Sequence, residues 1–329
     1  MSSNCPLIVL YYTLIYDMIL VMTEPTHSKD IIESLLPSEP FIGVFDSGVG
    51  GLSVLAQLTQ KLPNESFLYL GDSVHAPYGD RLPHDLFELT GRICLWFKAR
   101  GAKAIVAACN TASSTIISEL RALVAPLTIY SVLEAGVTGA AKTSKSQNIG
   151  VLATATTTNS RSFETGILAH LPAAKITGIA CPTFVPLVED NKISGSEAEL
   201  SVAEICSRFT DQEMDTVLLG CTHYPALTPL LRKYLPDRIA ILDPAAVFAE
   251  IIYSDLARHN LLAADSEGNS LLITTGDIRQ FVDSGTILLG KVPDPVFRLD
   301  SSELTGFSPL KTAHGRALAA QIAKSELSG

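Results

Sequence analysis

The chain has 329 residues, of which 47% are hydrophobic and 18% are charged. A chain of this length can bury the cores of two ordinary domains, and the composition excludes a disordered protein. The formal net charge is −10, and no basic patch interrupts it. An acidic surface repels phosphate backbones, so we expect no nucleic-acid partner.

The first 39 residues differ from the rest of the chain and form a leader or extension. Residues 6–22 are an apolar run that is short for a membrane-spanning helix and lacks the basic start and cleavage site of a signal peptide. Three interpretations stay open: translation that starts at Met18 or Met22, a packed extension, and a membrane anchor. Residues 23–39 have the composition of a loose leader. No membrane partner is expected.

From residue 40 onward, short apolar strands alternate with longer amphipathic helices, the pattern of parallel α/β units. In chain order, we expect strands at 41–45, 67–71, 104–109 and 127–133, and helices at 51–62, 85–101 and 111–124. The fold class is therefore α/β.

The same order of elements then restarts. NIGVLAT (148–154) repeats FIGVFDS (41–47) at an offset of 107 residues, and TVLLGCTH (216–223) repeats AIVAACNT (104–111) with the cysteines offset by 112. These near-equal offsets predict two pseudo-symmetric parallel-sheet α/β domains. Ligands bind beyond the carboxyl ends of parallel strands, so we expect the active site in the cleft between the domains.

Six cysteines are scattered along the chain without a C-x-x-C pair, at positions 5, 94, 109, 181, 206 and 221. This spacing is typical of reduced thiols in a cytoplasmic protein rather than of disulfides. We interpret Cys5, Cys94 and Cys206 as small buried hydrophobic residues, and we expect Cys181, which precedes a proline, to pack in the same way.

Cys109 and Cys221 differ from the other cysteines because each follows an apolar strand, so the two would face each other across the cleft. Racemisation needs two bases that flank one carbon, because a proton leaves one face and another proton returns to the opposite face. A thiol suits this work: its ordinary pKa is about 8.5, and a helix N-terminus or a cation lowers it. Both cysteines are expected to open a helix or tight turn, which favours thiolate. The alternative is that both are buried hydrophobic residues.

Several polar residues are candidates for assisting these thiols. His223 lies two residues after the second cysteine and can hold a proton near neutral pH. Asp46 begins DSGVGGLS, whose glycines also fit a partial dinucleotide loop; a carboxylate there would repel a pyrophosphate and suits a substrate ammonium or a base instead. Glu189 follows an apolar run and could orient His223. In a turn-rich loop, Tyr78 and Gly79 could close over a ligand carboxylate, or form an ordinary turn.

Five motifs in this order resemble the glutamate racemase family. They are DSGVGGL (46–52), GDSVHAPYG (71–79), CNTAS (109–113), CPTFVPLVE (181–189) and GCTHYP (220–225). The resemblance covers about residues 40–290 and favours glutamate racemases over related aspartate and hydantoin racemases. It implies glutamate as the small-molecule substrate, no pyridoxal phosphate or other cofactor, no metal, a supply of D-glutamate for peptidoglycan, a cytoplasmic location and a homodimer.

The resemblance also implies roles for individual residues. Cys109 would act on D-glutamate with help from Asp46. Cys221 would act on L-glutamate with help from His223, which Glu189 would support. Four pairs would bind the substrate: Asp46-Ser47, Tyr78-Gly79, Asn110-Thr111 and Thr222-His223.

In the family's usual arrangement, one domain would comprise residues 40–133 plus 243–329, and the other residues 134–242. The stretch at 273–290 resembles the segment that returns to the first domain. One position departs from the family's pattern: Phe163 stands where its members often carry an aromatic hydroxyl.

Three other functions stay open. A cysteine hydrolase or transferase would use Cys109 with His223 and leave the second thiol unexplained. A metal site would combine both thiols with His223. A two-domain amino-acid binding protein would bind glutamate without exchanging its α-proton, and nothing in it calls for paired thiols.

Overall fold

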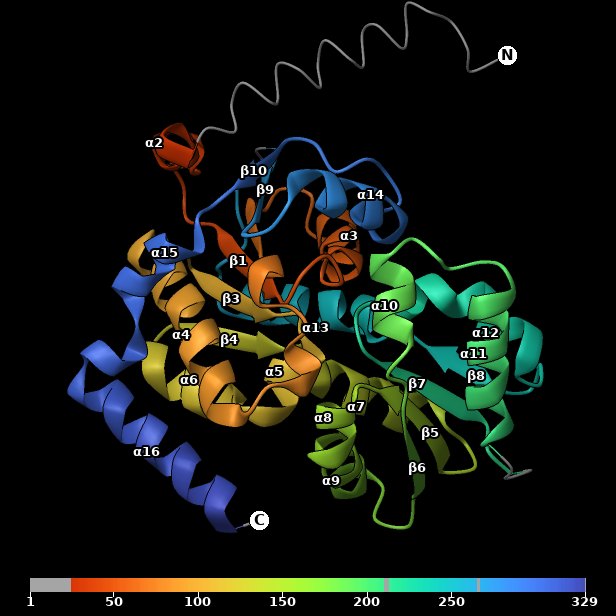
Figure 1. Ribbon diagram of the computed structural model, residues 1–329. Coiled ribbons are helices and arrows are strands. Elements are labelled where there is room, and N and C mark those ends of the chain that lie inside the picture. The colour runs from red at the N-terminus through yellow and green to blue at the C-terminus, as the bar shows by residue number, and fades with distance from the viewer. Residues whose placement is uncertain (1–24, 210–212, 265–266, 329) are drawn as a thin grey trace, which may run out of the picture.

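The computed structural model describes residues 25–209, 213–264 and 267–328 (Figure 1). Its strands form two sheets in which all paired strands are parallel. The larger sheet has the order β10-β9-β2-β1-β3-β4 and consists of β1 (Ile42–Asp46), β2 (Phe67–Gly71), β3 (Ala104–Ala107), β4 (Thr128–Ser131), β9 (Ser270–Thr274) and β10 (Val296–Arg298). The smaller sheet has the order β6-β5-β7-β8 and consists of β5 (Asn148–Ala153), β6 (Lys175–Ala180), β7 (Thr216–Gly220) and β8 (Ala240–Leu242).

Helices connect the strands and cover the sheets (Figure 1). The α-helices are α2 (Pro25–Leu35), α3 (Leu52–Lys61), α4 (Pro83–Ala99), α5 (Asn110–Thr115), α6 (Ile117–Val124), α7 (Val132–Thr143), α8 (Ala155–Asn159), α9 (Ser162–His170), α10 (Phe184–Glu189), α11 (Ser196–Ser207), α12 (Thr228–Tyr234), α13 (Pro244–Arg258), α14 (Ile278–Leu289), α15 (Ser301–Leu304) and α16 (Ala313–Ser328). The short 3₁₀ helices are η1 (Ser73–His75), η2 (Tyr78–Asp80), η3 (Tyr224–Leu227), η4 (Thr305–Phe307) and η5 (Pro309–Lys311).

The two sheets share one topology. Four strands of the larger sheet lie in the order β2-β1-β3-β4, and the strands of the smaller sheet lie in the matching order β6-β5-β7-β8. Every residue of the central strands β1, β3, β5 and β7 is buried, as expected for parallel strands that are covered on both faces. The prediction of two parallel-sheet α/β units with the same order of elements is confirmed.

The chain crosses between the two units twice, through α7 after β4 and through α13 after β8. α13 packs against α7 on one side and α3 on the other, so it lies between the units. It begins with Pro244 in its first turn and with Asp243 as N-cap, whose side chain accepts from Ala245 N at 2.9 Å. We call the unit with the larger sheet the first lobe and the other the second lobe. The domain boundaries at 133/134 and 242/243 stay a prediction.

One expected helix is broken. Residues 111–124 form α5 and α6, which are separated at Ile116, where φ is −137°. The hydroxyl groups of Ser114 and Thr115 both donate to the carbonyl of Thr111, at 3.0 and 2.7 Å. Such bonds compete with the regular backbone ladder, which gives a physical reason for the break.

The expectation of a loose leader at 23–39 is wrong for its described part. Residues 25–35 form α2, and Ile32 is buried in the core of the first lobe. Glu33 forms an ion pair with Arg100, whose guanidinium stacks on the ring of Trp96 at 4.0 Å. An apolar side chain and a paired charge therefore hold this helix.

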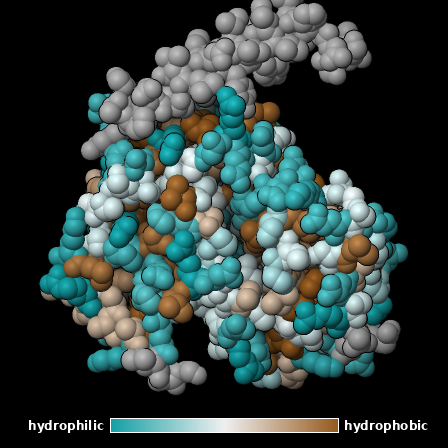
Figure 2. All heavy atoms as spheres, in the orientation of Figure 1, coloured by the Kyte–Doolittle hydropathy of each residue, from teal (hydrophilic) through white to brown (hydrophobic). Residues whose placement is uncertain are grey.

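The run at 6–22, with Met18 and Met22, lies outside the described residues. Within the described ranges, no helix combines the length and hydropathy needed to cross a membrane. The face shown in Figure 2 carries mainly hydrophilic side chains, with hydrophobic ones in scattered groups.

Candidate active site

The residues singled out in the sequence meet at the carboxyl ends of the central strands. Asp46 is the last residue of β1, Cys109 follows β3 as the N-cap of α5, and Cys221 follows β7 directly. All three are buried, with Asp46 fully so. Helix and tight turn begin where expected, because α5 starts after Cys109 and η3 starts shortly after Cys221.

The carboxylate of Asp46 joins the two lobes. Its Oδ1 accepts from Gly48 N at 3.1 Å and from Ser47 Oγ at 3.3 Å, and its Oδ2 accepts from Thr222 Oγ1 at 3.1 Å. Burial raises the pKa of Asp46, while the charge of His223 and these hydrogen bonds oppose the rise. Asp46 is therefore an acid whose charged state depends on its partners in the second lobe.

Gly50 allows this close approach. A Cβ at this position would lie 2.3 Å from Thr222 Oγ1 and 2.5 Å from His223 Nδ1, distances that no side chain can occupy. Ser53, the second residue of α3, donates to the carbonyl of Thr222 at 3.1 Å. The glycines of DSGVGGLS thus serve contact between the lobes, and the dinucleotide-loop alternative is not needed to explain them.

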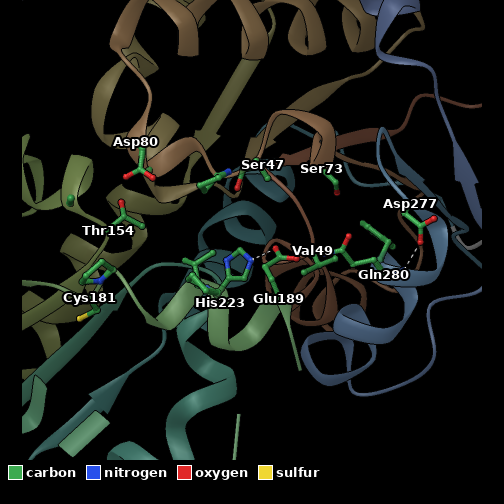
Figure 3. Close-up of a pocket in the computed structure, with 18 residues that line it drawn as sticks. Ser47, Val49, Ser73, Asp80, Thr154, Cys181, Glu189, His223, Asp277 and Gln280 are labelled. Carbon is green, nitrogen blue, oxygen red and sulfur yellow. Dashed lines mark hydrogen bonds and ion pairs between the residues drawn. The ribbon is translucent and has the colours of Figure 1, made fainter. Parts of the chain in front are cut away.

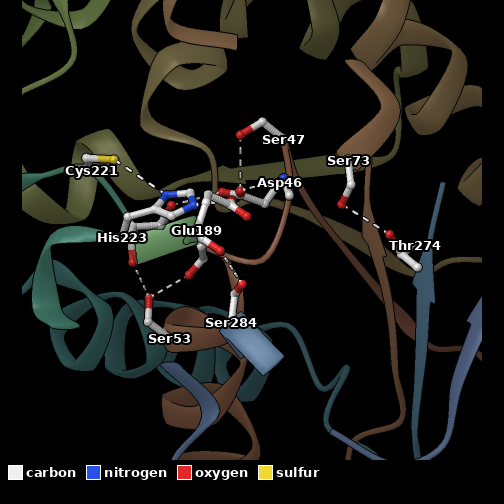
Figure 4. A network of polar contacts seen from close by, with 12 residues as sticks. Asp46, Ser47, Ser53, Ser73, Glu189, Cys221, His223, Thr274 and Ser284 are labelled. Carbon is white, nitrogen blue, oxygen red and sulfur yellow. Dashed lines mark hydrogen bonds and ion pairs between the residues drawn. The ribbon is translucent and has the colours of Figure 1, made fainter. Parts of the chain in front are cut away.

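A chain of polar contacts runs from Cys221 through His223 to Glu189 (Figure 4). His223 Nδ1 lies 3.8 Å from Cys221 Sγ, and its Nε2 lies 2.7 Å from Glu189 Oε1. Burial lowers the pKa of His223, but the hydrogen bonds to Cys221 and Glu189 outweigh it and raise the pKa well above the usual value. The imidazole is therefore held as a cation between the thiol and the carboxylate.

The surroundings of Cys109 are different. Burial raises its pKa to about 12, and the neighbouring charge of Asp46 adds to the rise. The N–H groups of Ala112 and Thr111 act in the opposite direction, as a helix N-terminus should, but they do not outweigh burial. The expected net preference for thiolate is therefore wrong for Cys109, which is a protonated thiol at neutral pH. Cys221 is also among the groups that raise the pKa of Cys109, so the two sulfur atoms interact electrostatically.

The residues expected to bind substrate are placed unequally. Asn110 is buried, and neither its side-chain oxygen nor its nitrogen has a hydrogen-bond partner among the described residues. Thr111 Oγ1 lies 3.2 Å from Thr154 Oγ1 across the lobe boundary. Tyr78 donates its hydroxyl to Asp72 at 2.7 Å and so supports its own loop. Buried polar groups in proteins normally have a hydrogen-bond partner. The side-chain amide of Asn110 has none among the described residues, so it is free to bind a ligand.

A cavity of about 350 Å³ lies between the lobes (Figure 3). Of the expected site residues, Ser47, Gly79, Glu189 and His223 line it. The lining residues do not include Asp46, Tyr78, Cys109, Asn110, Thr111, Cys221 or Thr222. The cavity therefore reaches the His223–Glu189 pair directly, whereas Cys109 and Cys221 are buried and do not line it.

Several lining residues were missed in the sequence, among them Ser73, Thr154, Asp277 and Gln280. Thr154 could have been found, because it follows β5 at the offset of 107 residues that relates it to Ser47 of the first lobe. Asp277 and Gln280 belong to the start of α14, a segment that the internal sequence repeat does not include.

The remaining described cysteines are free thiols that pack in the interior. Cys94 and Cys206 are buried, as predicted for small hydrophobic residues. Cys181 is also buried and donates to the carbonyl of Ile179 at 3.5 Å, but it lines the cavity as well. Cys5 lies outside the described residues. Among the residues that the structure describes, no group of three His, Cys, Asp or Glu side chains is placed to hold a metal ion.

Comparisons with known proteins agree with this arrangement. The sequence model of the Asp/Glu/Hydantoin racemase family matches residues 47–252. The chain belongs to this family. It is thereby assigned to the racemases, a class of isomerase.

Individual relatives match most of the chain. It is 36% identical to Glutamate racemase 2 of Caldanaerobacter subterraneus subsp. tengcongensis over 259 residues, which cover 79% of this chain and 97% of that one. The crystal structure of glutamate racemase from Francisella tularensis in complex with D-glutamate is similar with a TM-score of 0.75 at 28% identity, covering 80% and 98% of the two chains. That of isoform RacE1 from Bacillus anthracis gives 0.76 at 30% identity with the same coverage.

Proposed function

We propose that this racemase interconverts L- and D-glutamate without a cofactor, with Cys109 and Cys221 as the two bases. The observation that carries the proposal is the pair of buried thiols at the ends of equivalent strands, β3 and β7, close enough for one to raise the pKa of the other. Each thiol has its own ionisable partner, Asp46 on one side and His223 on the other. The glutamate racemases among its relatives support glutamate as the substrate.

The reaction needs one thiolate and one thiol at a time. In the L-to-D direction, the Cys221 thiolate takes the α-proton, the electrons of the broken C–H bond pass into the α-carboxylate system, and the Cys109 thiol delivers its proton to the opposite face. The reverse direction exchanges the two roles. Protonated His223 stabilises a thiolate at Cys221, since its Nδ1 lies 3.8 Å from the sulfur. Cys109, whose pKa is about 12, is ready as the acid.

Asp46 assists Cys109 in the D-to-L direction. Cys109 must then lose its proton, which burial opposes, and a neighbouring carboxylate can accept or share that proton. The raised pKa of Asp46 brings its basicity closer to that of a thiol. Glu189 has a supporting role because its contact at 2.7 Å keeps the His223 ring oriented and charged.

Neutral donors would bind the two carboxylates of glutamate. Of the described residues that line the cavity, none is Lys or Arg, whereas Ser47, Thr154 and the Gly79 peptide are present. The amide of Asn110, which has no described hydrogen-bond partner, and the hydroxyl groups of Thr111 and Thr222 are buried and do not line the cavity. Together with Tyr78, these groups supply donors for the charge that develops on the α-carboxylate.

The experiment that tests this function is incubation of the purified protein with L-glutamate in D2O, without any added cofactor. We expect α-deuterium to appear and the circular dichroism of glutamate to decay to zero. Bound glutamate that exchanges no α-proton would point to a binding protein instead. A thioester trapped on Cys109 or Cys221 with an acyl substrate would point to a hydrolase or transferase.

The proposal extends to the cellular role and to the assembly. D-glutamate from this cytoplasmic enzyme would supply peptidoglycan synthesis, which complementation of a bacterium that requires D-glutamate would test. We also propose a homodimer, to be tested by sedimentation, and domains of residues 40–133 plus 243–329 and 134–242. Separate expression of residues 134–242 as a folded unit would support this division.

A further inference from the structure

Two short elements from different lobes meet at one end of the cavity. They are η2 of the first lobe and α8 of the second, and they pack against each other. Gly79 and Asp80 line the cavity from the first, and Thr154 and Ala155 line it from the start of the second. Figure 3 shows Asp80 and Thr154 together at this end, with Asp277 and Gln280 at the other. The two elements therefore form one wall of the substrate cavity.

A side-chain hydrogen bond joins these elements: Thr156 Oγ1 donates to the carbonyl of Gly79. The approach is close, since a Cβ at Gly79 would lie 3.2 Å from the Cβ of Thr154. Thr154 is itself 3.2 Å from the hydroxyl of Thr111, which belongs to the first lobe. The bond thus fixes the separation of the lobes at the Tyr78-Gly79 pair, which we expect to bind substrate.

A second hydrogen bond joins the lobes at the opposite end of the cavity. There Ser284 Oγ of α14 donates to the carbonyl of Glu189 at 2.7 Å, and Ser284 is buried. By contrast, Thr156 is half-buried and Asp80 is exposed. A hydrogen bond that is partly exposed to solvent opens more easily than one that is fully buried, so the bond from Thr156 can break and re-form locally.

From this geometry we propose that Thr156 is a positioning residue, which holds the Gly79 peptide against the second lobe and so sets how tightly the site binds glutamate. The inference rests on the proposed function, since Thr156 acts through Gly79. The closed arrangement is the one in which both lobes contact glutamate. A chain without the bond spends less time closed, and its apparent affinity falls by that fraction.

Thr156→Val tests the proposal, because valine keeps the shape and removes the hydroxyl. A typical net hydrogen bond corresponds to a rise in KM of roughly three- to tenfold for both enantiomers, with kcat within about twofold of the wild type. Thr156→Ser, which restores a hydroxyl, should return KM to the wild-type value. Thr158→Val is the matched control on the same helix, since Thr158 Oγ1 is buried without a described hydrogen-bond partner. An unchanged KM in Thr156→Val, or an equal rise in Thr158→Val, would overturn the proposal.

A second measurement does not depend on racemisation. Cys109 and Cys221 are buried, so the rate at which iodoacetamide alkylates them, mapped by peptide mass spectrometry, reports opening between the lobes. We expect faster alkylation of these two thiols in Thr156→Val and a wild-type rate in Thr158→Val. Absence of glutamate racemisation in the wild type would remove the proposed function while leaving this measurement valid. Unchanged alkylation in Thr156→Val would remove the role of Thr156.

Discussion

The two lobes place a thiol at the same position and surround it with opposite charges. Cys109 follows β3 and lies near the carboxylate of Asp46, which raises its pKa. Cys221 follows β7 and lies 3.8 Å from His223, which is held as a cation. The negative neighbour favours the thiol form of Cys109, whereas the other half of the site places a positive charge beside its sulfur.

The difference can be traced to single positions of the repeat. The residue of the second lobe that corresponds to Asp46, at the offset of 107, is Ala153. The residue of the first lobe that corresponds to His223, at the offset of 112, is Thr111. Each lobe therefore carries one ionisable helper where the other carries a side chain that does not titrate. The repeated topology sets where the thiols lie, and these unequal positions set how each thiol behaves.

Replacing either thiol should have the largest effect. Cys109→Ser and Cys221→Ser should each lower the rate of racemisation on the order of 10³-fold or more, because serine is too weak a base to replace a thiolate. Measuring α-deuterium exchange of the same variants in D2O distinguishes the two halves of the site. With Cys109 replaced, Cys221 can still remove a proton and return deuterium to the same face, so L-glutamate should gain α-deuterium without racemising.

Cys221→Ser should give the mirror-image result, with exchange into D-glutamate alone. NMR of the α-position, measured from each enantiomer, reads both outcomes. Cys94→Ala, which changes a buried thiol of α4, is the control and should racemise normally. Exchange into the opposite enantiomer would reverse the assignment of the two faces, and full racemisation in either serine variant would contradict the two-base mechanism.

Asp46→Asn should separate activity from stability. We expect racemisation to slow about 100-fold, the lower end for a group that helps proton transfer. Stability should rise, because burial raises the pKa of Asp46 above its unfolded value and its ionised form therefore costs stability at neutral pH. That cost is absent below the unfolded pKa and grows as pH rises toward and through the folded one. A gain in Tm of about 1–3 °C at pH 7 would match this sign. A lower Tm with unchanged activity would give Asp46 a purely structural role.

Glu189→Gln should have a smaller effect on the other half of the site. Outer-shell partners of this kind typically change activity about 10-fold. Glu189 raises the pKa of His223, so its replacement lowers that pKa. Activity that needs protonated His223 is lost as pH rises through the pKa, and the alkaline limb of the pH–rate profile should move to lower pH. Asp80→Asn is the matched control, since Asp80 lines the same cavity but has no described contact with His223. An alkaline limb that stays in place would separate Glu189 from His223.

Much of the fold follows from local patterns. The strands at 41–45 and 67–71 were predictable because parallel strands covered on both faces are continuously apolar. The offset of the two cysteines was enough to place Cys109 and Cys221 at equivalent strand ends. Local patterns do not show where side-chain hydrogen bonds compete with those of the helix backbone. The break at Ile116 depends on hydroxyl groups that bind backbone carbonyls, and the residues around it look helical.

The sequence predicted which residues form the candidate site better than it predicted their pKa values. The contact of Glu189 with His223 joins positions 34 residues apart; the apolar run before Glu189 suggested it only weakly, and the family resemblance gave the stronger indication. The high pKa of Cys109 could not be predicted from its place at a helix N-terminus, because burial and Asp46 are properties of the assembled lobes. Thr156 was missed for the same reason, since its partner Gly79 lies in the other lobe.

Replacing Asp215, at the opposite end of β7 from Cys221, should have the smallest effect. It should change Tm in the opposite direction to Asp46→Asn. Burial acts to raise its pKa, but hydrogen bonds from Ser144 Oγ at 2.6 Å and from Ser146 N at 2.7 Å help to lower it to about 2. A lowered pKa contributes stability that is present above the unfolded value and is lost as pH falls through about 2. Asp215→Asn should therefore lower Tm by about 1–2 °C at pH 7, a difference that disappears in acid, and leave racemisation unchanged. Thermal unfolding across pH measures this, and an equal loss at every pH would mean that shape rather than charge matters at this position.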